Sequence, residues 1–517
     1  MPETCFKAGG LNDGLSMHPV NTGYTPFPYL VGSTKIRGRS DFFSQVKLRR
    51  NLNEQKTRKS ITTMKRMLIF SLLACACSLC AQTLYTPEWE SLDQRPVPEW
   101  WQEAKFGIFI HWGVYSVPAY AAEVGKSSAR FSEWYWKNLE RDIPGVRNHH
   151  EQFFSGLEYP DFATQFRAEY YEPAKWAELF KQSGAKYIVL TSKHHDGYAL
   201  WPSAYSPCWN SMYIGSHRDL AGELSAAVKA TGLHMGFYYS LLEWYNPLYA
   251  PETASRWGAE MNLPQMKELV TRYQPDVLWT DGEWDFTDKE LHSEEFLAWL
   301  YNESPVKDSI VVNDRWGKGV RWKHGGHRTS EYGGTHARVE PDFMHPWEEC
   351  RGIGYSFGYN QFETMDDYMT SAQCVELLAD VVSRGGNLLL NIGPKANGLI
   401  PVVMQERLLD MGGWLDVNGE AIYGTKAWKH RPENMKKTQV YFTKKPDALY
   451  AICASWPQEP LVVESVGKAD SVALLGSTVP VEFSCADGRL IIQPPTLNPG
   501  NMPCDFAWTF KVTSPNL

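Results

Sequence analysis

The chain has 517 residues, of which 43% are hydrophobic and 21% are charged, which excludes a disordered, collagen-like or mostly membrane-embedded protein. This length predicts about three average domains, or one large barrel with a smaller partner. The net charge is −8, and residues 1–63 carry ten Lys or Arg against four Asp or Glu, so the remaining residues carry a net charge of −14. An acidic protein of this kind is expected to bind a neutral or cationic partner, not nucleic acid.

The first 81 residues do not resemble a globular domain. Residues 1–63 lack Trp and periodicity, and we expect a disordered extension or an upstream translation start. Residues 64–81 join a short basic region to an uncharged stretch that is too short for a membrane span and typical of a signal peptide. Cleavage near Ala81 and lipidation of Cys75 are the two alternatives. Both predict export, to the periplasm or the extracellular space, without a transmembrane span.

Between residues 82 and 424, short apolar runs alternate with helical patterns, which indicates parallel strands in an α/β fold. Six strands are expected, at 106–110, 187–190, 234–239, 276–279, 310–313 and 387–391. Helices are expected at 173–184, 219–232, 264–273, 294–301 and 366–384. Polar residues follow almost every strand and no Gly-rich phosphate-binding turn follows the first, so we predict a (β/α)8 TIM-like barrel with its active residues at the carboxyl ends of the strands.

The pattern changes in residues 425–517, where short β runs are broken by turns. We predict a C-terminal antiparallel β-sandwich there. The six cysteines from Cys208 to Cys504 are scattered and include no Cys-x-x-Cys pair. Neither a disulfide framework nor a zinc site is expected from them.

The predicted strand ends are rich in His and carboxylates, and they offer no Ser nucleophile elbow and no Cys beside a strand-end His. Hydrolysis of a glycosidic bond needs two carboxyl groups, one as acid and one as nucleophile or base. Asp281, at the tip of the strand DVLWT, is the expected nucleophile, with Arg315 one strand later to keep it ionised. The acid is left open between Glu331 and Glu348, both expected on long loops over the barrel mouth.

Seven motifs, in order, resemble the alpha-L-fucosidases of glycoside hydrolase family 29: KFGIFIHWGVYSVP, SEWYWKN, TSKHHDGYALWPS, PDVLWTDGEW, VVNDRWG, WEEC and GGNLLLNIGP. They lie between Pro87 and Tyr423. The resemblance implies an exo-acting, retaining alpha-L-fucosidase that removes terminal α-L-fucose from glycans or glycoconjugates by double displacement. It implies Asp281 as the nucleophile and Glu331, in a T-x-E-Y motif, as the preferred acid/base, with Glu348 as the alternative.

The resemblance also implies a pocket for an uncharged deoxy sugar, and it implies no cofactor and no metal. The substrate-binding residues that it predicts are His111, Glu133, Trp134, His194, His195, Tyr239, Trp279, Arg315 and Phe357. At Phe357 the family often has Trp, so this chain keeps an aromatic wall there but lacks a hydrogen-bond donor.

Three alternatives remain at this point. A metal-dependent barrel hydrolase would use His111, His194 and His195, although the first strand lacks an H-x-H pair. A non-catalytic fucose-binding protein would keep the same pocket, and a related barrel glycosidase would act on another sugar.

The 21 Trp residues either build a large core or line the cleft. Six of them stand beside polar strand-end or loop motifs and are expected in the cleft: Trp112, Trp134, Trp279, Trp284, Trp316 and Trp347.

Overall fold

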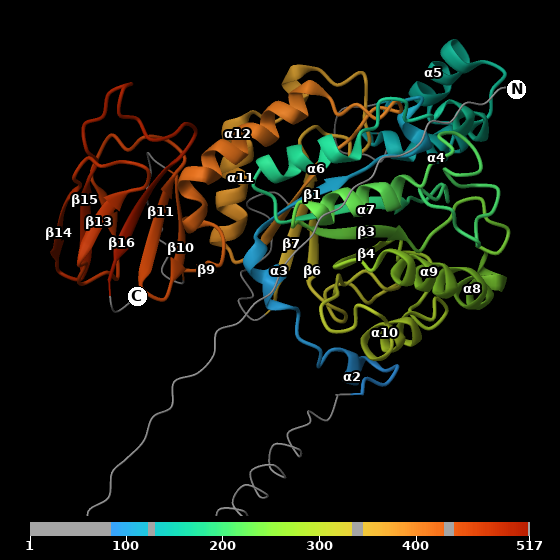
Figure 1. Cartoon of the computed structure of the whole chain (residues 1–517), viewed down its shortest axis with the longest axis horizontal. Helices are drawn as coiled ribbons and strands as arrows, with labels where there is room; N and C mark the ends of the chain where they lie inside the picture. The colour runs from blue at the N-terminus through green and yellow to red at the C-terminus, as the bar shows by residue number, and fades with distance from the viewer. Residues whose placement is uncertain (1–83, 123–129, 333–344, 429–438, 515–517) are drawn as a thin grey trace, which may run out of the picture. The chain divides into compact units, whose positions relative to one another are not determined.

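A computed structural model describes residues 84–514 except 123–129, 333–344 and 429–438 (Figure 1). The predicted extension (1–63), the predicted signal peptide (64–81) and Cys75 lie outside the described residues. Within the described part, no helix is long and apolar enough to span a membrane.

Eight parallel strands form one curled sheet, as the barrel prediction requires. Their bounds are β1 (Phe106–Ile110), β2 (Tyr187–Lys193), β3 (His234–Ser240), β4 (Val277–Asp281), β5 (Val311–Val312), β6 (Arg328–Glu331), β7 (Trp347–Gly352) and β8 (Asn387–Ile392). The strands pair in the order β5-β4-β3-β2-β1-β8-β7-β6. Two backbone hydrogen bonds, from Gly326 N to Asn313 O and from His327 N to Val312 O, bridge the two edges of the sheet.

Helices separate most of the barrel strands in the chain. The helices are α2 (Trp89–Leu92), α3 (Glu99–Ala104), α4 (Tyr135–Glu140), α5 (Pro144–Phe154), α6 (Pro173–Gln182), α7 (Leu220–Ala230), α8 (Ala254–Trp257), α9 (Leu263–Tyr273), α10 (Ser293–Asn302), α11 (Ser371–Ser383) and α12 (Val402–Asn418). Local signals start several of them: Asp219 caps α7 by accepting from Gly222 N, and Pro173 opens α6. Residues 313–327, between β5 and β6, contain only turns, so the (β/α) alternation is interrupted there.

Strands β6 and β7 were not expected from the sequence. Their sequences, RTSE and WEECRG, lack the apolar runs that marked the other six strands. The expectation that Glu331 and Glu348 lie on loops is therefore wrong, since Glu331 ends β6 and Glu348 is the second residue of β7.

The C-terminal part contains two antiparallel sheets that share one core, as predicted for a sandwich. Their strands are β9 (Lys426–Ala427), β10 (Val440–Lys445), β11 (Ala448–Cys453), β12 (Leu461–Val463), β13 (Ser471–Leu474), β14 (Glu482–Ala486), β15 (Arg489–Gln493) and β16 (Trp508–Thr513). The sheet orders are β13-β16-β11-β10-β9 and β12-β15-β14. Helix α11 contacts both β8 and β10, so it links the barrel to the sandwich (Figure 1).

Candidate active site

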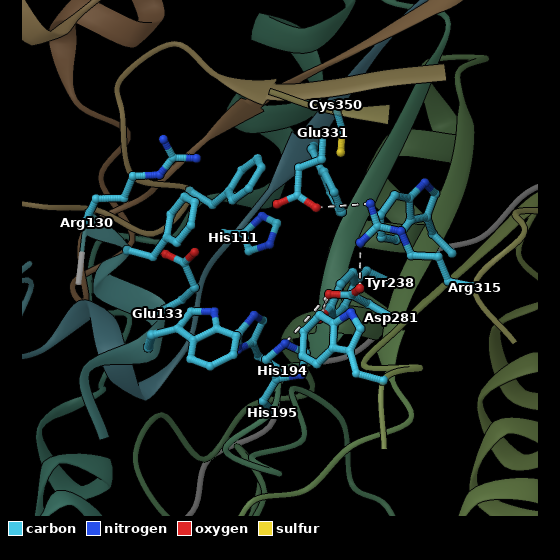
Figure 2. Close-up of a pocket in the computed structure, with 16 residues that line it drawn as sticks. His111, Arg130, Glu133, His194, His195, Tyr238, Asp281, Arg315, Glu331 and Cys350 are labelled. Atoms are coloured by element: carbon cyan, nitrogen blue, oxygen red, sulfur yellow. Dashed lines mark hydrogen bonds and ion pairs between the residues drawn. The ribbon is translucent and has the colours of Figure 1, made fainter. Parts of the chain in front are cut away.

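A cavity of about 250 Å³ opens at the carboxyl ends of the barrel strands (Figure 2). This is the end of a parallel barrel where catalytic groups are found. Most of the predicted site residues line it: His111, Glu133, Trp134, His194, His195, Trp279, Asp281, Arg315, Glu331 and Phe357. Trp284, which was expected in the cleft, also lines it. Five further lining residues were not expected from the sequence: Phe109, Arg130, Phe131, Tyr238 and Cys350.

Asp281 is the last residue of β4, and three neighbours surround its carboxylate. Arg315 Nη1 donates to Oδ1 at 2.6 Å, Tyr238 Oη donates to Oδ2 at 2.9 Å, and His195 Nε2 lies 3.7 Å from Oδ2. Burial alone would raise the pKa of Asp281, but the charge of Arg315 and these hydrogen bonds outweigh it and lower the pKa to about 2. The carboxylate is therefore ionised and held in a fixed orientation, as a nucleophile must be.

A tight turn follows Asp281. Gly282 has φ +78°, and a Cβ there would lie 2.7 Å from the Cβ of Leu242. Glycine tolerates this left-handed backbone and this close approach, so it lets the chain leave the strand directly after Asp281.

Arg315 also connects Asp281 to the second carboxylate of the cavity. Its Nη2 donates to Glu331 Oε2 at 3.0 Å, and its Nε donates to Thr329 Oγ1 at 3.0 Å. Figure 2 shows one guanidinium between the two carboxylates. The same cation thus holds both groups at one cavity, within reach of a single bound sugar ring.

Glu348 lies deeper in the barrel, outside the residues that line the cavity. It pairs with Thr329, two positions before Glu331, which places it about 6–7 Å further from the mouth. It is 1% exposed and accepts hydrogen bonds from the Tyr187 hydroxyl and from Trp279 Nε1. This position gives Glu348 a role in holding the floor of the pocket and favours Glu331 as the acid.

Three histidines of the cavity are neutral, and the hydrogen-bond network assigns the tautomers of two of them. Burial lowers the pKa of His111 to about 3 and that of His195 to about 4. His111 Nδ1 lies 2.7 Å from Asn391 Oδ1, and His195 Nδ1 lies 2.6 Å from Ser240 Oγ, which itself donates to Leu242 O. Both Nδ1 atoms therefore donate, and each Nε2 is left as an acceptor for a ligand hydroxyl.

His194 is buried too, and its Nδ1 has no hydrogen-bond partner among the described residues. Burial lowers its pKa well below the usual value. A buried ring nitrogen at a cavity is satisfied when a ligand binds, so His194 is suited to a third hydroxyl contact.

Glu133 and Phe357 line the other side of the pocket. Glu133 accepts from Gly358 N at 2.8 Å, and burial raises its pKa to about 7. The Phe357 ring stacks on His111 with 4.8 Å between centroids, and on Phe131 with 5.6 Å. This side therefore offers an apolar wall beside one polar group, which suits a sugar that has a methyl group.

Tyr239 does not lie in the pocket, which corrects the prediction. Its hydroxyl donates to Gln265 Oε1 at 2.8 Å and lies 3.2 Å from Asn262 Oδ1, on the helix side of the barrel. Its neighbour Tyr238 faces the cavity. Successive residues of a strand point to opposite faces, so a choice wrong by one residue along β3 reverses the direction of the side chain.

Comparison with known proteins shows the family to which the chain belongs. The family model for alpha-L-fucosidase matches residues 72–420, and the model for the alpha-L-fucosidase C-terminal domain matches residues 433–513. The chain belongs to the alpha-L-fucosidase family. It is 42% identical to an alpha-L-fucosidase of Branchiostoma floridae over 87% of this chain and 99% of that protein. It is 43% identical to a tissue alpha-L-fucosidase of Rattus norvegicus over 84% of this chain and 93% of that protein.

A crystal structure of Thermotoga maritima alpha-fucosidase in complex with fucose has the same fold. The TM-score is 0.70 at 36% sequence identity, covering 83% of this chain and all of that chain. This family member therefore shares both the barrel and the C-terminal domain with relatives from animals and from a bacterium.

In this alpha-L-fucosidase family member, the register between strands β3 and β4 explains why Tyr238 lies in the pocket. Tyr238 pairs in register with Trp279, and Ser240 with Asp281, so the position of Asp281 fixes which β3 residues face inward. Arg130 and Phe131 directly precede the SEWYWKN motif, and no feature of the sequence marks them as pocket residues. Among the described residues, no group of three or more His, Cys, Asp or Glu side chains is arranged to hold a metal ion.

Tyr238→Phe is expected to lower kcat/KM about ten- to a hundredfold, because it removes a hydrogen bond to the charged Asp281. The matched control is Tyr239→Phe, which removes a hydroxyl of the same kind outside the cavity. That variant is expected to keep kcat/KM within about threefold and to lose stability to urea instead. Steady-state kinetics and urea titrations of both variants separate the two positions. Equal losses of activity would contradict the assignment of Tyr238.

The buried carboxyl of Glu283 is expected to make the free energy of unfolding depend on pH. Burial raises the pKa of this carboxyl from 4.5 to about 7, against the attraction of Arg315. Below pH 4.5 the group is protonated in both the folded and the unfolded chain. As the pH rises towards 7, the unfolded chain loses the proton first, so the contribution of Glu283 to folding stability is lost. Glu283→Gln is therefore expected to gain about 1–3 kcal/mol of unfolding free energy over wild type between pH 4 and pH 8. A difference independent of pH would contradict this.

Proposed function

We propose that the protein hydrolyses terminal α-L-fucose from glycans or glycoconjugates, with retention of configuration at the anomeric carbon. The observation that carries the proposal is the pair Asp281 and Glu331, held by one guanidinium at one cavity. Retaining enzymes need two carboxyl groups close together on either side of the reacting bond. Neutral histidines and aromatic walls complete a pocket for an uncharged sugar that carries a methyl group.

The first step forms an ester. Asp281 attacks the anomeric carbon as the glycosidic C–O bond breaks, and Glu331, in its acid form, gives its proton to the departing oxygen. The charge of Arg315 beside Asp281 keeps the attacking group ionised. The product is a fucosyl-enzyme ester at Asp281 and a free aglycone hydroxyl.

The second step returns the enzyme to its starting state. Glu331, now a carboxylate, takes a proton from water while the water oxygen attacks the anomeric carbon. The bond between that carbon and the Asp281 oxygen breaks, and Asp281 leaves as a carboxylate. Two inversions give net retention, so the first fucose released is the α-anomer.

Hydrolysis of 4-nitrophenyl α-L-fucoside, compared with the corresponding galactoside, tests the sugar preference. We expect the fucoside to be preferred, because a hydroxyl at the sugar C6 would meet the apolar wall at Phe357. Proton NMR during the first turnovers is expected to show α-fucose before mutarotation. Preference for the galactoside would favour another barrel glycosidase, and binding of fucose without turnover would favour a non-catalytic sugar-binding protein.

We also propose that the protein is exported, to the periplasm or the extracellular space. The proposal rests on the signal-like sequence of residues 64–81. After expression of the full chain in a bacterium, the mature N-terminus is expected near Ala81, or at a lipidated Cys75 that Cys75→Ser abolishes. An intact N-terminal segment on a cytoplasmic protein would contradict export.

A further inference from the structure

A second cavity, of about 350 Å³, opens on the same end of the barrel as the candidate active site. The segments after β2 and β3 and helix α4 line it, and none of its residues takes part in the mechanism above. Four aromatic side chains and two carboxylates are the features that matter for binding: Trp136, Tyr205, Trp209, Tyr245, Asp196 and Glu243.

The aromatic walls of this cavity are fixed before any ligand binds. Trp136 stacks between Tyr159, with ring centroids 4.6 Å apart, and Tyr245, at 3.7 Å. Trp209 Nε1 donates to the backbone oxygen of Asp196 at 2.8 Å, and the Tyr245 hydroxyl donates to Glu140 at 2.8 Å. A ligand that enters here does not have to order the walls, which reduces the entropic cost of binding. Tyr245 is 37% exposed, so its ring lies at the mouth.

The two carboxylates supply polar contacts within these apolar walls. Asp196 and Glu243 are each 6% exposed. Asp196 accepts from the Tyr159 hydroxyl at 2.8 Å, and Glu243 accepts from Lys193 Nζ at 2.6 Å. Each carboxylate oxygen can accept more than one hydrogen bond, so a ligand hydroxyl can still be satisfied. The positive charge of Lys193 balances Glu243, and the carboxyl of Asp196 disfavours an anionic ligand.

We propose that this cavity binds a neutral pyranose residue of a glycan. A pyranose has an apolar C–H face for an aromatic ring and hydroxyl groups that donate to carboxylates. The choice of a sugar rests on the proposed function, since an enzyme that acts on glycans meets such residues.

The position of the cavity supports this assignment. His195 lines the catalytic cavity, and the next residue, Asp196, lines the second one. Likewise, Trp134 lines the catalytic cavity and Trp136 lines the second one. One wall therefore separates the two cavities. A glycan held in the second cavity stays close to the catalytic one, which raises the local concentration of its fucosyl branches.

The proposal is tested by titration with two neutral disaccharides that contain no fucosyl unit, N-acetyllactosamine and lactose. Free fucose is added at a saturating concentration so that it occupies the catalytic cavity. At least one of them is expected to bind to the wild type. Tyr245→Ala is expected to raise its Kd about tenfold, which corresponds to a loss of about 1.4 kcal/mol of binding free energy. Tyr245→Phe keeps the ring and loses only the hydroxyl, so its Kd is expected to match the wild type. Absence of saturable binding of both disaccharides, or an unchanged Kd in Tyr245→Ala, would overturn the proposal.

A second measurement does not depend on how Tyr245→Ala folds. Cys208 is exposed and lines the cavity, so N-ethylmaleimide at its thiol is expected to block the disaccharide. Cys208→Ser, treated in the same way, is expected to keep binding, which controls for the other cysteines. Retained binding in alkylated wild type would overturn the proposal. Hydrolysis of 4-nitrophenyl α-L-fucoside is expected to continue in both proteins, and its absence from untreated wild type would contradict the proposed function instead.

Discussion

Asp281→Gly is expected to lower kcat/KM for 4-nitrophenyl α-L-fucoside by at least about 10³-fold, because the attacking carboxylate is gone. Arg315 and Tyr238 lose their common acceptor in this variant. The rest of the pocket keeps its lining, so fucose is still expected to bind. Steady-state kinetics and a fucose titration measure the two effects separately.

Azide is expected to restore turnover to Asp281→Gly, which would identify Asp281 as the nucleophile. A small anion fits the space of the missing carboxylate and attacks the same carbon, so a fucosyl azide is the expected product. Asp285→Asn is the control, because Asp285 is exposed, lies four residues further along and accepts from the Tyr249 hydroxyl outside the cavity. Its activity is expected to match the wild type. A variant Asp281→Gly that keeps most of its activity without azide would show that another group is the nucleophile.

Glu331→Ala is expected to show a strong dependence on the leaving group. General acid catalysis contributes about 10²- to 10⁴-fold, and a sugar alcohol needs the proton while 4-nitrophenolate leaves without it. Thus kcat/KM for a natural fucosylated glycan is expected to fall by that factor, and for the nitrophenyl fucoside by about tenfold or less. The ratio of the two losses identifies the acid, because loss of the contact with Arg315 affects both substrates equally.

Glu348→Ala is the matched control for Glu331. This change removes the acceptor of the Tyr187 hydroxyl and of Trp279 Nε1, deep in the barrel. It is expected to lower stability and to reduce kcat/KM by the same factor for both substrates. If Glu348→Ala gives the leaving-group dependence and Glu331→Ala does not, the two roles are exchanged.

The fold was predictable from the sequence where the strands are apolar on both faces. β2 and β8 are buried along their whole length, and both begin at the expected residue; β2 ends three residues and β8 one residue later than expected. β6 and β7 were missed because their inward-facing positions carry polar residues such as Thr329, Glu331 and Glu348, in a barrel that holds a polar site. Ser330 and Glu349, on the opposite face, are polar as well, so neither face gives an apolar run. Polar residues in a strand thus make it hard to detect from hydropathy, and the same residues indicate that the strand belongs to the site.

The site residues were predictable where a motif fixes one side chain, and less so where two neighbours compete. Asp281 and Arg315 meet as expected, whereas Tyr239 was chosen in place of Tyr238, because the sequence does not show which of two adjacent tyrosines points inward. The Trp residues divide similarly. Trp134, Trp279 and Trp284 line the cavity, while the others expected there are buried in the core: Trp112, Trp316 and Trp347.

Trapping the covalent intermediate tests the central claim most directly. A 2-deoxy-2-fluoro-fucosyl fluoride slows both steps, because fluorine at C2 disfavours the oxocarbenium-like transition state, while the good leaving group lets the first step proceed. After digestion, mass spectrometry is expected to find the fluorofucosyl mass on the peptide that contains Asp281, and to find none after Asp281→Gly. A label on Glu331 or Glu348, or inactivation without any label on the Asp281 peptide, would contradict the account.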